Sequence, residues 1–443
     1  MHFAFKNKPL LNSILYSSIA AIGGILYGYH TAAISGALFF IKDQFFLSLF
    51  EQEFLVAVIL IGGFFGSWMG GIFSDKLGRK KTFLISIIIL FFSNFILANS
   101  ATKTLLLVSR GFVGISIGIF TTIAPIYIAE IADPRYRGRL VTLNQFGIVL
   151  GILFSNIASI FFTRSSNWQM IFLMGLIPTF FMFLGLLIIP ESPSWLICKN
   201  KEEEAYNILK VLNKETDSLN ILKTLEKPSN TSWKNLFDKS VRSALIVGIS
   251  LNVFRHITGT NIVTYYAPVI FKMAGIGSTK NALIATASLN FINILMNIVA
   301  IFLIDKIGRK PLLRMGLSGM AISLLGVSSF FFFQISSPIF IVILLTLFKS
   351  SFSIGLGANT WLINSEIYPI GIRGRAIGIS SFMNWMANYL VSISFLSLLN
   401  GLGNSSTFIL YSAICVVAYV FIQKKVPETR NQTLAQAHDH FKK

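Results

Sequence analysis

Five basic side chains interrupt stretches of this sequence that are otherwise apolar. They are His30, Arg110, Arg255, His256 and Lys349. If such a stretch crosses a bilayer, a cation near its centre costs about 2.5–3.5 kcal/mol on insertion scales, so it usually faces a cavity or a partner. The sequence places no Asp or Glu at comparable depth. The cations therefore need another counter-charge, unless Lys349 extends to the membrane surface and the arginines bond backbone carbonyls or water.

Amide and indole side chains form a second group within the apolar stretches: Gln145, Asn261, Asn293, Trp361, Asn384, Trp385 and Asn388. Each can orient and satisfy a hydroxyl group, so the set suits a polyol, although a single membrane Asn or Gln can instead bond a neighbouring helix. The chain contains neither the phosphate-binding pattern G-x-x-x-x-G-K-[ST] nor a metal-ligand cluster. We therefore expect no enzyme activity, no ATP-driven step, no metal and no cofactor.

The amino-acid composition indicates which kind of structural element contains these residues. The 443 residues are 54% hydrophobic and 12% charged, whereas soluble domains carry about 25% charged residues. A soluble enzyme, a nucleic-acid binder and a disordered chain are thereby excluded. Apolar stretches long enough to cross a bilayer as helices lie near 11–40, 54–74, 82–99, 105–130, 140–163, 168–189, 242–270, 281–304, 312–333, 338–364, 375–399 and 405–423. The sequence predicts an all-α membrane protein with twelve transmembrane helices.

The net charge of +19 indicates the orientation of these helices. Most Lys and Arg residues fall in the tails and the even-numbered loops, and the opposite side holds only Lys42, Lys103, Arg164, Lys272 and Lys280. By the positive-inside rule, both termini are cytoplasmic. We expect a multi-pass protein of the plasma (inner) membrane, in contact with the lipid bilayer and not with nucleic acid.

The predicted organisation has four parts. Residues 1–194 form a first six-helix half, 195–241 an amphipathic helical linker, 242–424 a second six-helix half and 425–443 a cytoplasmic tail. Within the linker, EEEAYNILKVL at 202–212 places its apolar residues on one helical face.

Three motifs occur twice, in the same order. SDKLGRKK is repeated as IDKIGRKP, AEIADPRYRGR as SEIYPIGIRGR, and PESPSW as PETRNQ. A six-helix unit has therefore been duplicated, so the halves are pseudo-symmetric. Transporters built this way often bind their solute at the midplane between the halves.

These motifs resemble those of the sugar porters of the major facilitator superfamily, over about residues 10–435. The resemblance implies the major facilitator fold and a monomeric secondary transporter that moves a sugar or polyol by alternating access. It also implies that charged groups at the inner helix ends latch the halves together: Asp75, Arg79, Glu130, Arg137, Asp305, Arg309, Glu366 and Arg373. Alternatively these groups are topological anchors, worth under about 1 kcal/mol each when exposed.

The resemblance also assigns solute-binding residues. Gln145, Asn261, Asn293 and Trp361 occupy positions that bind sugar in the family, and Asn384 and Trp385 lie nearby in the eleventh stretch. Arg255 and His256 stand where the family has two glutamines, and with Lys349 they are further candidates.

The departure at His30 concerns ion coupling. Proton-coupled members have an Asp here, near the Arg that this chain keeps as Arg110. Protonation of His30 would add a cation beside Arg110 instead of neutralising an anion, so we favour facilitated diffusion or movement of an anion over proton symport through this residue. Organic anions such as a sugar phosphate, a sugar acid or an aromatic acid are the alternative solutes. A sensor that binds without transport is a further class, and would be expected to carry a long signalling tail.

Overall fold

The computed structural model describes residues 8–132, 136–163, 167–212, 239–368, 373–430 and 440–441. Within these ranges the secondary structure is helical, without β-strands. Eleven helical spans are long and apolar enough to cross a membrane. The predicted seventh stretch, 242–270, is instead covered by two consecutive helices, α11 (Lys239–Ile257) and α12 (Thr260–Met273). Gly259 separates them with a left-handed φ of 91°, a conformation that glycine adopts without strain.

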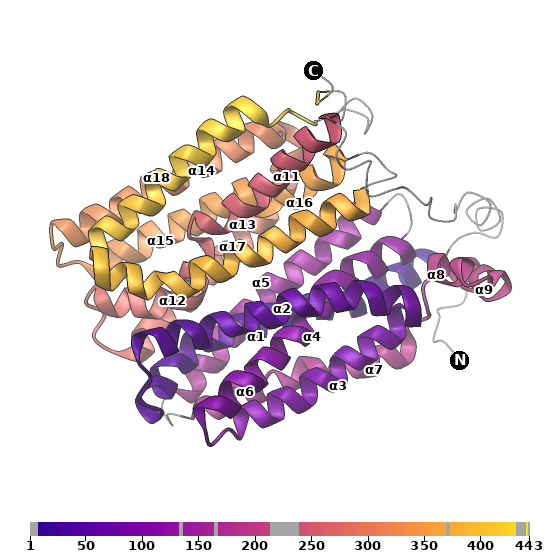
Figure 1. Cartoon of the computed structure of the whole chain (residues 1–443), viewed down its shortest axis with the longest axis horizontal. Coiled ribbons are helices and arrows are strands. Elements are labelled where there is room, and N and C mark those ends of the chain that lie inside the picture. The colour runs from indigo at the N-terminus through magenta and orange to yellow at the C-terminus, as the bar shows by residue number, and fades with distance from the viewer. Residues whose placement is uncertain are drawn as a thin grey trace. The chain divides into compact units, whose positions relative to one another are not determined.

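The chain forms two compact units, Met1–Phe46 with Val58–Ser229 and Leu47–Ala57 with Asn230–Lys443. In Figure 1 the colour runs from indigo to magenta along the first half of the chain and from pink to yellow along the second half. The helices of the first unit are α1 (Pro9–Gln44), α2 (Leu49–Leu77, from Val58 onward), α3 (Arg79–Ala98), α4 (Lys103–Ile131), α5 (Arg137–Phe162), α6 (Trp168–Leu173), α7 (Leu176–Ile188), α8 (Pro193–Cys198) and α9 (Glu202–Leu212).

Close helix contacts organise the first unit. A Cβ added to Gly24 or Gly28 of α1 would collide with the α5 backbone at Asn144 or Ile148. Only glycine lets two helix backbones approach this closely. At the other end of the unit, α9 buries Ala205, which packs with Leu196 of α8.

The second unit contains α11, α12, α13 (Thr279–Ile307), α14 (Arg309–Phe332), α15 (Pro338–Phe352), α16 (Ala358–Ile367), α17 (Arg373–Leu402) and α18 (Asn404–Lys425). A five-residue π-helix, η2 (Ser353–Gly357), joins α15 to α16 within one span. Gly355 of η2 packs against Gly316 of α14.

Glu53, near the start of α2, is a fully buried carboxylate. Its two oxygens accept hydrogen bonds from the backbone N (2.7 Å) and the Oγ (2.6 Å) of Ser397 in α17. The surrounding residues 47–57 belong to the second unit, so this contact ties the beginning of α2 to that unit.

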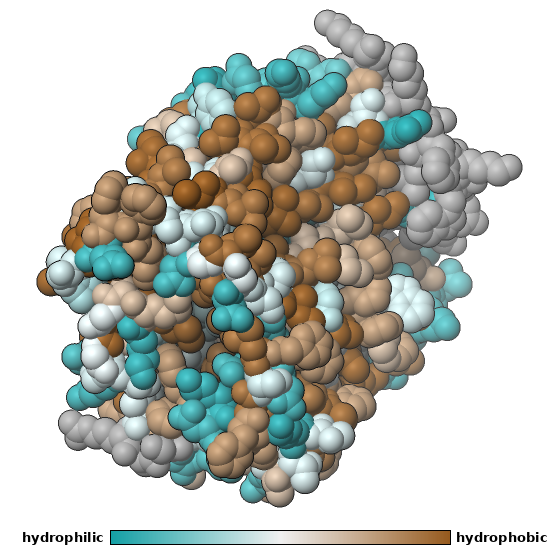
Figure 2. Space-filling model, turned by 60° about the vertical axis from the view of Figure 1, so that its left-hand side comes forward, coloured by the Kyte–Doolittle hydropathy of each residue, from teal (hydrophilic) through white to brown (hydrophobic). Residues whose placement is uncertain are grey.

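Large apolar side chains are exposed along the spans, among them Phe65, Trp68, Phe92, Phe180, Ile322 and Ile339. Figure 2 shows apolar residues spread broadly over one face of the molecule. Apolar surface on this scale indicates contact with lipid.

Candidate functional site

A charge cluster lies at the inner helix ends of the first unit. The Arg79 guanidinium donates to both carboxylate oxygens of Glu130, at 3.0 and 2.8 Å. This bidentate geometry is the strongest arrangement of an arginine with a carboxylate. Asp75 is a weaker partner, 3.4 Å from Arg79, and its side chain is 80% exposed.

The second unit repeats this cluster. Arg309 Nη2 donates to Glu366 Oε1 at 3.1 Å, and Thr429 Oγ1 donates to the other oxygen of the same carboxylate. Both arginine–glutamate pairs join helices of one unit. The side chains of Arg137, Asp305 and Arg373 lie outside the described part of the structure, so their predicted roles stay predictions.

Two glutamates that the sequence analysis did not assign complete these clusters. Glu191 Oε1 accepts a hydrogen bond from the backbone N of Arg79 (2.9 Å), and Glu428 Oε1 accepts one from the backbone N of Arg309 (3.0 Å). Each carboxylate thereby caps the positive N-terminus of the helix that follows a left-handed glycine. The available signal was the third repeated motif, because both residues follow its proline.

Burial shifts the pKa of Glu191, the carboxylate that caps the helix in the first unit. Desolvation raises the pKa of the Glu191 carboxyl, and hydrogen bonds from the backbones of Ser192, Arg79 and Lys80, with the charge of Arg79, oppose the rise. The hydrogen bonds of the cap therefore offset part of the free-energy cost of burying the charged Glu191 carboxylate.

A chain of hydrogen bonds crosses the polar interior of the second unit. His256 Nε2 lies 2.7 Å from Asn384 Oδ1, and Asn261 Nδ2 lies 3.0 Å from His256 Nδ1. Asn261 Nδ2 also donates to Asn388 Oδ1 at 2.7 Å, and Asn388 Nδ2 donates to the Tyr265 hydroxyl at 3.2 Å. The structure thus brings three predicted residues, Asn261, His256 and Asn384, into one cluster.

The break in the seventh stretch positions this cluster. His256 stands in the last turn of α11 and Asn261 in the first turn of α12. The turn at Gly259 lets both side chains approach α17, which carries Asn384 and Asn388. An uninterrupted helix would place residues five apart on different faces.

Two predicted cations lie close to the cluster. The Arg255 guanidinium stacks over the ring of Trp361 at 5.3 Å, an attractive cation–π contact. Lys349 is 4% exposed, and its Nζ donates to Thr264 Oγ1 at 2.6 Å. Thr264 was not predicted, since a threonine in an apolar span gives no distinguishing signal.

Asn293 and Trp385 have different surroundings. The side-chain oxygen of Asn293 accepts a hydrogen bond from Ser353 of η2, which is the helix–helix contact considered as the alternative role. Trp385 is buried in α17.

The first unit holds the remaining predicted residues. His30 and Arg110 are each 1% exposed, and the Arg110 guanidinium lies over the Phe172 ring at 5.9 Å. Neither ring nitrogen of His30 has a hydrogen-bond partner among the residues that the structure describes. Gln145 is half-buried on α5.

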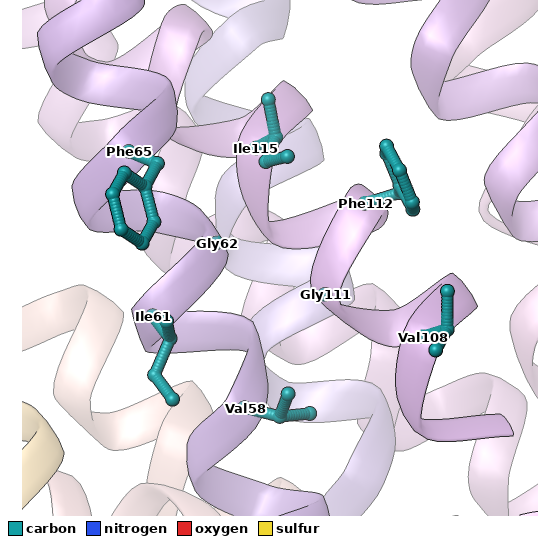
Figure 3. Close-up of a pocket in the computed structure, with 8 residues that line it drawn as sticks. All are labelled: Val58, Ile61, Gly62, Phe65, Val108, Gly111, Phe112 and Ile115. Carbon is teal, nitrogen blue, oxygen red and sulfur yellow. The ribbon is translucent and has the colours of Figure 1, made fainter. Parts of the chain in front are cut away.

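A crevice of about 200 Å³ lies between α2 and α4. Figure 3 shows that its walls are apolar side chains and that Gly62 and Gly111 lie where the helices approach each other. With no hydrogen-bonding side chain in its lining, it does not suit a polyol.

Comparisons with known proteins agree on one family. The family model described as "Sugar (and other) transporter" matches residues 16–441. The arabinose-proton symporter of Bacillus subtilis (strain 168) is 34% identical over 438 residues, covering 96% of this chain and 94% of its own. The D-xylose transporter of Levilactobacillus brevis is 37% identical over 423 residues, covering 94% and 92%. Among solved structures, a partially occluded inward-open conformation of the xylose transporter XylE from E. coli matches with a TM-score of 0.85 and 29% identity, covering 96% of this chain and 100% of that one.

Proposed function

Because the chain belongs to the sugar porter family of the major facilitator superfamily, it is an integral membrane transporter and not an enzyme, and we propose that it moves a sugar or polyol across the plasma membrane by alternating access. Both termini are cytoplasmic in this proposal, as the distribution of Lys and Arg indicates. The protein works as a monomer.

The observation that carries the proposal is the hydrogen-bonded chain of Asn384, His256, Asn261 and Asn388. Its members hold one another by hydrogen bonds in the absence of a solute. A sugar hydroxyl both donates and accepts, and can replace one of these bonds without leaving a buried group unpaired. Gln145, Asn293 and Trp361 are the further solute contacts that the family resemblance supports. Trp385, the neighbour of Asn384 in the sequence, is a further candidate.

Coupling is the second part of the proposal. Relatives of this chain are named proton symporters, but His30 lies where such transporters use an acid. A proton on His30 would add a positive charge close to Arg110, in a buried environment that disfavours charge. We therefore favour transport without proton symport through position 30.

The inner charge clusters set the balance between outward-open and inward-open states in this proposal. The bidentate pair of Arg79 with Glu130 and the pair of Arg309 with Glu366 support it. Organic anions are the second candidate class of solute, and the buried cation Lys349 is the observation that favours them.

Uptake into proteoliposomes tests the proposal, with a panel of neutral sugars, polyols and organic anions. Replacing Asn261 by Ala removes a partly buried hydrogen-bonding group and should weaken the apparent affinity for the transported solute roughly 5- to 150-fold. The exposed residue Asn281 of α13 provides the matched control, Asn281→Ala. Unchanged affinity in Asn261→Ala would remove the cluster from the solute site.

A further inference from the structure

Lys349 lies near the middle of a membrane span and is buried there. It is the twelfth residue of the 27-residue span Pro338–Asn364, and only 4% of it is exposed. Its Nζ donates to Thr264 Oγ1 at 2.6 Å and lies 6.0 Å from the centre of the Phe352 ring. A threonine hydroxyl satisfies one of the three ammonium donors but carries no charge to balance it.

Other positive charge surrounds this ammonium. Arg255 lies close enough for its charge to repel that of Lys349. Thr264, the hydrogen-bond partner of Lys349, lies about one turn beyond the start of α12. Two like charges in a low-dielectric interior raise each other's cost of burial.

Among the described residues of the second unit, no carboxylate forms an ion pair with Lys349. Between residues 239 and 425 the sequence contains only two acidic residues, Asp305 and Glu366, and both lie toward the inner helix ends. Glu53 is occupied by Ser397. Within the described part of the second unit, the charge of Lys349 therefore has no carboxylate partner, and an anionic solute can supply one.

Thr264, the hydrogen-bond partner of Lys349, lies on the same face of α12 as Asn261 of the hydrogen-bonded chain. Thr264 follows Asn261 by three residues in α12, which places both side chains on one side of the helix. Arg255 and His256 are consecutive residues in the last turn of α11. Donors for a charged group and donors for hydroxyls thus adjoin each other within one unit.

We propose that the transported solute is a sugar acid, whose carboxylate pairs with the Lys349 ammonium while its hydroxyls bind the amide and histidine side chains. This inference rests on the proposed sugar transport and names the class of sugar. A carboxylate brings one negative charge and fits an ammonium already bound to Thr264. A phosphate group brings a larger charge and more acceptor oxygens than the single Lys349 ammonium would match, because the Arg255 guanidinium already lies over the Trp361 ring.

The test compares binding and uptake of glucuronate, gluconate, glucose, sorbitol and glucose 6-phosphate by the purified full-length protein in proteoliposomes. In the parent protein we expect glucuronate or gluconate to compete with the neutral compounds for binding. We also expect the acid to bind more tightly and to be taken up faster than they are. Lys349→Met keeps the length of the side chain and removes its charge. Loss of one partner of a buried ion pair should lower the ratio of sugar-acid to neutral-sugar affinity roughly 30-fold or more.

Lys272→Met is the matched control, because Lys272 also donates to a threonine, Thr279, but at an exposed position. This control should keep the ratio of the parent protein. Lys349→Gln supplies a second neutral variant if the methionine variant does not fold.

Three outcomes would overturn the inference: uptake of neutral sugars without sugar acids, uptake of the sugar phosphate in preference to the acids, or an unchanged affinity ratio in both Lys349 variants. The first of these leaves sugar transport itself intact. Absence of uptake for every compound in the panel would instead contradict the proposed function, and the inference with it.

Discussion

His256 lies between two amides that determine which of its ring nitrogens carries the hydrogen. The Asn261 amide nitrogen can only donate, so Nδ1 accepts, and Nε2 therefore donates to the Asn384 oxygen. The ring connects α11 and α12 to α17 in one defined orientation. A glutamine, which the family has at this position, also offers a donor and an acceptor.

His256→Phe should lower the stability of the protein. The phenyl ring fills the space but leaves the Asn261 and Asn384 side chains without their partner, at a cost of about 1–3 kcal/mol for a buried group. Thermal unfolding in detergent measures the loss, and His256→Gln should recover part of it. Equal melting temperatures for the parent and the Phe variant would contradict the role of this chain of hydrogen bonds.

Gly175→Ala should disturb His30. A Cβ at position 175 would lie 2.5 Å from Cε1 and 2.9 Å from Nε2 of the His30 ring, so the ring must shift, at roughly 1–3 kcal/mol. Thermal unfolding should show destabilisation that the double variant with His30→Ala relieves. Gly71→Ala is the control, since no heavy atom lies within 4 Å of a Cβ there.

At the scale of the helices, the pattern of apolar residues predicts where a span lies but not where its helix breaks or changes type. The stretches of apolar residues predicted the spans, and the fold class is confirmed. The pattern missed the division of 242–270 at Gly259, because a local left-handed turn changes neither the length nor the hydropathy of the stretch. It missed the π-helix at Ser353–Gly357 for the same reason.

The residues of the candidate site could be predicted from the sequence, but their partners could not. Polar residues within apolar spans identified His256, Asn261 and Lys349 as candidates, because their types are unusual there. Their partners could not be predicted from spacing. Asn261 bonds Asn388 across 127 positions and Lys349 bonds Thr264 across 85, distances that only the packed helices define.

Arg79→Ala and Arg309→Ala should change the rate of transport with little effect on solute affinity in a fixed conformation. Each substitution leaves a partly buried glutamate at an inner helix end without its charge partner. Accessibility labelling of introduced cavity cysteines should shift toward the inward-open state. Lys81→Ala, at an exposed position of the same helix end, serves as control. Labelling equal to that of the parent would leave the arginines as anchors.

At the scale of the whole molecule, the proposed coupling predicts the energetics of uptake. An imposed pH gradient should not drive accumulation through His30, because a proton there adds charge beside Arg110 without neutralising an acid. Proteoliposome uptake with and without the gradient, in the parent protein and in His30→Ala, measures this. Accumulation that requires the gradient and disappears in His30→Ala would overturn the proposal.

The capped turn at Gly78 and Glu191, with its copy at Gly308 and Glu428, has a consequence for the history of the protein. Both copies share the left-handed glycine, the arginine after it and the distant glutamate, so the ancestral six-helix unit had this turn before it was duplicated. The cluster around His256 lies outside the three repeated motifs. The turns therefore belong to the duplicated motifs, and the proposed solute cluster does not. Substitutions in them should scale the transport of every solute by one common factor, whereas substitutions around His256 should change the ranking of solutes.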